Sequence, residues 1–361
     1  MRVHRLAAAT AVTAAMSGAL ALLPAAPGAI VLSAQAAPSA TRAGLADVVP
    51  VREWKVPWED SRPRDPMADG EGRVWFVGQA GNYVAYLNPT TGQFKRYEIA
   101  AGTHPHNVVV GPDGAAWYAG NRNGHIGRID PATGEVTRFP MPDSAVKDPH
   151  TMTFAPDGDL WFTAQFGNVV GRLTPRTGQV RLVKIPTEKS RPYGLVLDSK
   201  GRPWFDLFGV NQIGTIDPAS MRLRTYTLPD ERARPRRIAI TSDDAVWYVD
   251  YTRGFLGKLD PASGAVKEWP NPGGAASLPY AMTVDDRDRL WFVETGRQPN
   301  RLVGFDPRSE RFFGMTTIES GGGTVRHMTF DRRSGQVWFG TDVGTIGRAT
   351  VGPGPRRPIS E

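Results

Sequence analysis

The chain of 361 residues contains no cysteine. Disulfides, a thiolate nucleophile, zinc–sulfur sites and a cysteine-linked lipid anchor are therefore excluded. Clusters of Lys and Arg with interleaved aromatic residues are also missing, and the formal net charge is only +7. The sequence thus predicts no nucleic-acid partner. A protein without disulfides must be stabilised by burial, and a chain of this length can bury a large fraction of its surface.

Long hydrophobic runs are missing except near the N-terminus. There, two arginines precede an uncharged, alanine-rich run over residues 6–23, and residues 34–36 read Ala-Gln-Ala. A basic start, an apolar run and small residues at a cleavage site are typical of a secretory signal peptide. We therefore predict a signal peptide over 1–36, a linker over 37–50, and a secreted or periplasmic protein with no membrane attachment after cleavage. The alternative is an uncleaved anchor, because 18 residues can just span a bilayer.

Tryptophans recur at a nearly constant spacing. The intervals are 42, 44, 43, 43, 44 and 47 residues, and each Trp is followed by Phe or Tyr. A period of about 40–45 residues, with four strands in each repeat, is the signature of a β-propeller. The sequence therefore predicts an all-β, seven-bladed propeller over residues 51–350. The repeated tryptophans are Trp75, Trp117, Trp161, Trp204, Trp247, Trp291 and Trp338.

The last repeat lacks a fourth strand. It ends after the third strand near residue 350, and residues 351–361 are rich in Pro and Gly, as in a flexible tail. Residues 51–56, however, resemble the outer strands of other repeats, such as 136–140 and 266–270. We therefore predict that the N-terminal strand completes the seventh blade and so removes a free sheet edge.

Propeller geometry predicts where a site would lie. The first residues of each inner strand and the residues after each Trp phrase should encircle one mouth of the central channel. The inner strands are expected to open at Pro66-Met67, Pro105-His106, Pro149-His150, Pro192-Tyr193, Pro235-Arg236, Pro279-Tyr280 and Arg326-His327. The residues after the Trp phrases include Gln79, Asn121, Gln165, Asp206, Asp250, Glu294 and Asp342. Carboxylates, amides and imidazoles in one ring can bind a hard cation or transfer protons, or each carboxylate can simply pair with a local arginine.

These motifs resemble the virginiamycin B lyase (streptogramin B lyase) family of seven-bladed propellers. The similarity is carried by the Pro-His and Pro-Tyr openers, the Trp-Phe strands and the Ile-Gly-Arg strands over about residues 50–350. The resemblance implies opening of a cyclic depsipeptide by elimination, with a histidine base and a divalent cation, Mg²⁺. It places the base at His327 and the metal-binding carboxylate at Asp342. Val325 and Tyr280 depart from the acidic residue and the further histidine of the family.

The residues are compatible with more than one site and more than one function. His106, His150, Tyr193, Arg236 and Tyr280 are expected to bind a small-molecule or cyclic depsipeptide substrate. A rotated arrangement would centre the site on the blades that carry His106 and His150, with a metal bound by imidazoles. A non-catalytic, extracytoplasmic propeller that binds a peptide, glycan or metal is also possible, as is a metal-dependent lactonase that uses Glu294, Asn121 and Asp250. We expect a monomer.

Overall fold

The computed structural model describes residues 49–352. The predicted signal peptide and most of the predicted linker and tail lie outside the described residues. Val351 is buried and its backbone N–H donates to the Gly335 carbonyl, so ordered packing extends slightly past the predicted end of the propeller. Across residues 49–352, the structure has no helix with the length and apolar character that a membrane span requires.

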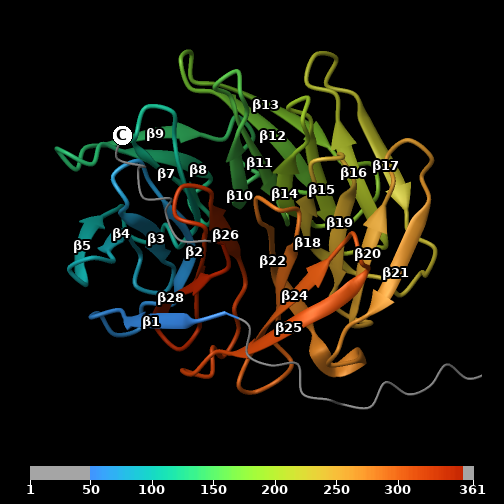
Figure 1. Cartoon of the computed structure of the whole chain (residues 1–361). Helices are drawn as coiled ribbons and strands as arrows, with labels where there is room; N and C mark the ends of the chain where they lie inside the picture. Colours follow the sequence, from blue (N-terminus) through green and yellow to red (C-terminus); the bar gives the residue numbers. More distant parts are fainter. Residues whose placement is uncertain (1–48, 353–361) are drawn as a thin grey trace, which may run out of the picture. The chain divides into compact units, whose positions relative to one another are not determined.

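The described chain forms seven antiparallel four-stranded sheets, as the tryptophan period predicts (Figure 1). The innermost strands are β2 (Pro63–Ala68), β6 (Pro105–Val110), β10 (Pro149–Phe154), β14 (Pro192–Leu197), β18 (Pro235–Ile240), β22 (Pro279–Val284) and β26 (Met328–Asp331). The second strands are β3 (Val74–Gly78), β7 (Ala116–Gly120), β11 (Leu160–Ala164), β15 (Pro203–Leu207), β19 (Val246–Asp250), β23 (Leu290–Glu294) and β27 (Gln336–Gly340).

The two outer positions of each blade complete the sheets. The third strands are β4 (Tyr83–Asn88), β8 (His125–Ile129), β12 (Val169–Thr174), β16 (Gln212–Ile216), β20 (Phe255–Leu259), β24 (Arg301–Asp306) and β28 (Thr345–Thr350). The outer strands are β5 (Gln93–Glu98), β9 (Val136–Pro140), β13 (Gln179–Lys184), β17 (Leu223–Thr227), β21 (Val266–Pro270), β25 (Arg311–Thr317) and β1 (Val51–Lys55). One short 3₁₀ helix, η1 (Ala275–Ser277), precedes β22.

The predicted closure of the seventh blade is confirmed. β1 pairs antiparallel with β28, from Val51 opposite Ala349 to Lys55 opposite Thr345. Successive inner strands contact one another around the ring, and β26 contacts β2. The first and last parts of the propeller therefore share one sheet.

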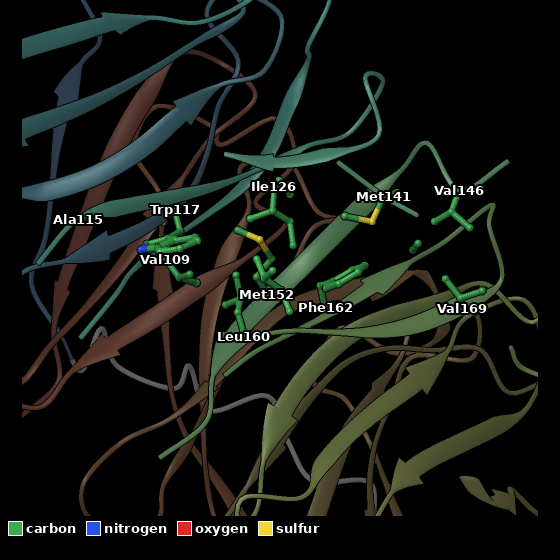
Figure 2. Close-up of a cluster of buried hydrophobic side chains, with 13 residues drawn as sticks. Val109, Ala115, Trp117, Ile126, Met141, Val146, Met152, Leu160, Phe162 and Val169 are labelled. Carbon is green, nitrogen blue, oxygen red and sulfur yellow. The ribbon is translucent and has the colours of Figure 1, made fainter. Parts of the chain in front are cut away.

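The core lies between neighbouring blades. Figure 2 shows one such cluster, in which Trp117 of the second blade shares a buried group with Met152 and Phe162 of the third blade. The same arrangement places the other repeated tryptophans in equivalent clusters, which explains their period. Burial of an aromatic residue of this size contributes several kcal/mol to folding.

The glycine of the Ile-Gly-Arg strands is required by packing within its own blade, although a glycine in a strand can also mark the close approach of another backbone. Gly127 is directly opposite Tyr118 of the adjacent strand, and a Cβ on Gly127 would collide with the Tyr118 ring. Gly347 and Phe339 repeat the relation. The glycine therefore leaves room for the aromatic residue that follows each tryptophan.

The inner strands are irregular at the point where they enter the sheet. In six blades the register with the second strand shifts immediately after the opening residues, as between Pro149 and Met152. Such bulges re-aim side chains and are common beside functional sites. This irregularity determines which residues face the mouth of the channel.

Candidate functional site at the channel mouth

The structure confirms five of the seven predicted opening positions and corrects two. In the seventh blade β26 begins at Met328, so Arg326 and His327 lie just before the inner strand. In the first blade the opener is Pro63-Arg64 rather than Pro66-Met67, because Pro63 pairs with Gly78 as Pro105 pairs with Gly120. Met67 instead lines the channel below the mouth. A signal was available in the sequence, since Pro63 precedes Trp75 by the same 12 residues that separate Pro105 from Trp117.

The structure brings five predicted substrate-binding residues into one contiguous array. The ring centroids of His106 and His150 are 3.6 Å apart, and those of His150 and Tyr193 are 4.1 Å apart. The Tyr193 and Tyr280 hydroxyls share a short hydrogen bond. All four side chains are buried. The array runs from β6 through β10 and β14 to β22, across four blades of the ring.

Arg236, the fifth of these residues, lies against this array on aromatic rings. Its guanidinium carbon is 3.9 Å from the ring centroid of Tyr280, 4.1 Å from that of Tyr251 and 4.4 Å from that of Phe208. Tyr251 and Phe208 follow second strands, and sequence reasoning missed both. A guanidinium stacked on aromatic faces keeps its N–H groups in its own plane, where they can bind a carboxylate.

A second layer of polar side chains crosses the channel directly beneath the openers. Arg237 extends from β18 to donate to the Thr151 hydroxyl at 3.0 Å and to the Arg326 carbonyl at 2.9 Å. Its Nη2 also lies 3.8 Å from Oδ2 of Asp65. Asn107 donates to the same carboxylate oxygen at 3.0 Å. Side chains from four blades and a backbone carbonyl from a fifth therefore meet across the channel.

Sequence reasoning missed this second layer because of the bulges. In a regular strand, neighbours point to opposite faces, so a residue after a channel-facing opener should point away. The register shift after Pro235 turns both Arg236 and Arg237 toward the mouth. Only the pair of consecutive arginines in the Pro-Arg-Arg opener distinguishes this blade in the sequence.

His327 occupies the boundary between the mouth and the channel below. It lies one residue before β26, is partly exposed, and borders both the lower cavity and a narrow gap that also contacts Asp342. Burial and the nearby positive charge of Arg237 lower the pKa of His327 to about 4. The imidazole is therefore neutral at neutral pH and can accept a proton, although the lowered pKa makes it a weaker base than an ordinary histidine.

Asp342 lies on the same side of the channel as His327, but its carboxylate is engaged. Arg326 donates to it at 2.6 and 3.2 Å, and Arg62 donates at 3.4 Å. Burial alone would raise the pKa of Asp342, but the two guanidinium groups outweigh burial and lower it. Asp342 is thus an ionised partner of arginines.

The expected metal site does not fit this arrangement. Among residues 49–352, no group of three or more His, Cys, Asp or Glu side chains is placed to hold a metal ion. The two carboxylates that a lactonase would use, Asp250 and Glu294, are buried and paired with Arg253 and Arg301. A divalent cation prefers several free oxygen ligands. The carboxylates at the mouth are instead already bound to arginines, so the reaction proposed below does not use magnesium.

The Tyr193–Tyr280 pair has an unusual protonation balance. Burial and the neighbouring Tyr280 raise the pKa of Tyr193 to about 12. Burial also acts to raise the pKa of Tyr280, but Arg236, Arg237, Arg64 and Arg326 together lower it. Tyr280 is therefore the better proton donor of the pair, and Tyr193 is the better proton acceptor.

Unpaired polar atoms gather at the mouth. Buried polar atoms in folded proteins nearly always have partners, so exceptions indicate a bound ligand, water or a catalytic role. Within the described part of the chain, eight such atoms from this region lack a hydrogen-bond partner. They are Arg64 Nε, Asp65 Oδ1, His106 Nδ1, His150 Nε2, Asp206 Oδ1, Arg236 Nε, Arg237 Nη2 and His327 Nδ1.

The fold and this mouth define a class of protein, a seven-bladed propeller with a polar site at the entrance of its channel. The model of the virginiamycin B lyase family matches residues 49–349, and the chain belongs to that family. A search of curated proteins found no match.

Solved structures agree with the family assignment. A structure titled as streptogramin B lyase is 25% identical, with a TM-score of 0.76 over 84% of this chain and 98% of that chain. A catalytically inactive His-to-Ala variant of virginiamycin B lyase from Staphylococcus aureus with quinupristin is 25% identical, with a TM-score of 0.76 over 84% of this chain and 99% of that chain. The extracellular domain of a putative hybrid two-component system from B. thetaiotaomicron is 15% identical, with a TM-score of 0.64 over 86% and 44%, and shares only the fold.

Proposed function

We propose that the protein is a lyase that opens an ester or lactone linkage, with a cyclic depsipeptide as the leading substrate class. The observation that carries this proposal is the position of His327. Its neutral imidazole borders the mouth, Nδ1 has no partner within residues 49–352, and arginines surround the space where negative charge would develop. Family membership supports the same reaction.

The proposed reaction uses groups that this chain supplies. His327 accepts a proton from the carbon next to a carbonyl. The electrons left behind form a carbon–carbon double bond, the C–O bond breaks, and the ester oxygen departs as part of a carboxylate. Negative charge develops on the carbonyl oxygen and then on the leaving group. Guanidinium groups and the Tyr193–Tyr280 hydroxyls are fixed donors that can stabilise this charge without a large rearrangement.

Mass spectrometry tests the reaction directly. The mature protein is incubated with a streptogramin B depsipeptide and, separately, with simple lactones. Elimination leaves the mass of the opened product unchanged, whereas hydrolysis adds the mass of water. Hydrolysis would contradict the proposed chemistry. If a folded protein turns over neither substrate class, the lyase proposal fails.

A second candidate function is supported by the pairing of Asp342. Because this carboxylate is bound by Arg326 and Arg62, the mouth could serve as a binding site without catalysis. Ligand binding with no turnover in the same experiment would favour this candidate. Secretion and a monomeric state stay predictions, which cell fractionation and size-exclusion chromatography test.

A further inference from the structure

The mouth carries more guanidinium groups than carboxylates that could balance them. Arg62, Arg64, Arg236, Arg237 and Arg326 lie around it, and the nearby acids are Asp65, Asp206 and Asp342, besides Asp250 and Glu294, which Arg253 and Arg301 balance. Burial raises the pKa of Asp206 well above its usual value, which favours its neutral form. The region therefore has an excess of positive charge in a partly buried setting, where charge interactions are strong.

Four of the arginines lie within 4.0 Å of a carboxylate, and Arg236 differs, since its polar neighbour is the Tyr193 side chain. Arg62 and Arg326 bind Asp342, Arg64 donates to Gln79, and Arg237 donates to Thr151. Within residues 49–352, Arg236 has no ion pair, and its Nε is buried without a hydrogen-bond partner. Aromatic rings lie within 6 Å of its guanidinium carbon. A contact with an aromatic face stabilises a positive charge less than an ion pair with a carboxylate does.

From these observations we propose that Arg236 is the anion-binding residue of the mouth, and that the site takes a carboxylate-bearing ligand rather than a divalent cation. The planar guanidinium matches a carboxylate through two parallel hydrogen bonds. Its stacking partners Tyr280 and Tyr251 hold that plane in place. Carboxylate recognition alone does not require catalysis. One part of the inference rests on the proposed lyase function. In that reaction, the carboxylate bound by Arg236 is the leaving group of the elimination.

The same arrangement makes the site independent of magnesium. Guanidinium groups occupy the region in which the family resemblance places a cation, and they keep Asp342 engaged. Stabilisation of the leaving carboxylate then comes from arginine. We therefore expect the reaction of this chain to proceed in the presence of a chelator.

The test uses a matched pair of probes, N-acetyl-phenylalanine and N-acetyl-phenylalaninamide, which differ by one negative charge. Calorimetric titration of metal-free protein at low salt should show the acid binding at least tenfold more tightly than the amide. Arg236→Gln should remove that preference, and Arg236→Lys should retain part of it. Arg232→Gln is the control, because its side chain is 77% exposed and pairs with Asp230.

A titration with magnesium chloride alone tests the opposite possibility, that the mouth binds a cation. Titration into the metal-free protein should give no saturable binding at the mouth. Saturable 1:1 magnesium binding that Asp342→Asn abolishes, or equal binding of the acid and the amide, would overturn the proposal. Failure of the acid to bind at millimolar concentration would do the same. Loss of turnover with carboxylate binding intact refutes only the lyase proposal, and thermal melts of each variant show that it is folded.

Discussion

The two halves of the central channel are formed by the same inner strands, yet they differ in chemistry. At the mouth, the openers are arginine, histidine and tyrosine, and many of their polar atoms are unpaired. A few residues further along the same strands, the channel contains a cavity of about 430 Å³, where methionines such as Met67, Met152 and Met282 line the wall together with threonines and a few charged side chains. We therefore expect the lower half to contribute mainly to stability, whereas the unpaired polar atoms at the mouth cost stability and are available for the proposed binding.

The largest expected effect concerns His327 at the junction of the two halves. His327→Ala should lower turnover by about 10²–10⁴-fold, because a positioned general base contributes that much. The melting temperature should change little. Steady-state kinetics with the depsipeptide checks this, and Tyr97→Phe, in an outer strand, is a control. If only His150→Ala abolished turnover, the rotated arrangement would be correct instead.

The second prediction compares two residues on one strand, His150 and Met152 of β10. Met152→Ala should lower the free energy of unfolding by about 2–5 kcal/mol, because it leaves a cavity in a packed cluster. Turnover per folded molecule should stay near that of the parent. His150→Ala should show the reverse pattern, with reduced ligand binding and a smaller loss of stability. Urea unfolding measures the stability of the two variants, and steady-state kinetics measures their turnover. If both variants changed stability and turnover alike, the two halves of the channel would not differ in role.

The third prediction concerns acidity. Burial lowers the pKa of both His327 and His125 to about 4, with further lowering by nearby arginines. Between pH 4 and 6.5 the unfolded chain therefore binds more protons than the folded chain, so stability falls as the pH is lowered through this window. Each group accounts for up to about 3 kcal/mol at pH 4. Urea unfolding at pH 7 and pH 4.5 measures the loss, and His125→Gln should reduce it. A flat profile would contradict the lowered pKa of these two histidines.

The smallest effect is expected at Asp342. Asp342→Asn removes charge from a partly exposed ion pair with Arg326, and such pairs contribute about 1 kcal/mol or less. The melting temperature should fall by a few degrees at most, and turnover in a chelator should equal turnover in magnesium for both proteins. A magnesium requirement that disappears in the variant would restore Asp342 as a metal ligand.

Much of the fold follows from the sequence because repetition amplifies weak signals. One Trp-Phe phrase is ambiguous, but seven at a fixed period predict the blades, and the resemblance of residues 51–56 to outer strands predicts the closure. The opener positions of five blades are predicted correctly for the same reason, and the seventh inner strand begins one residue after the predicted His327. The prediction for the first blade is wrong because that blade contains two prolines three residues apart, Pro63 and Pro66, and only the spacing to Trp75 distinguishes them.

The candidate site is less predictable because it depends on local irregularity and on partners distant in sequence. The bulge that turns Arg237 into the channel has no clear mark in the sequence. The engagement of Asp342 by Arg62 joins residues 280 positions apart. Residue types at aligned positions therefore predict which groups gather at the mouth, but not which of them are already paired.

The pairing of β1 with β28 has a consequence for how the site forms. Val51 and Ala349 become neighbours only when nearly the whole propeller has been synthesised, and contacts of such long separation form slowly. Until β1 pairs with β28, the seventh blade lacks its outer strand and the ring is not closed. We therefore expect ligand binding at the mouth to require both ends of the propeller.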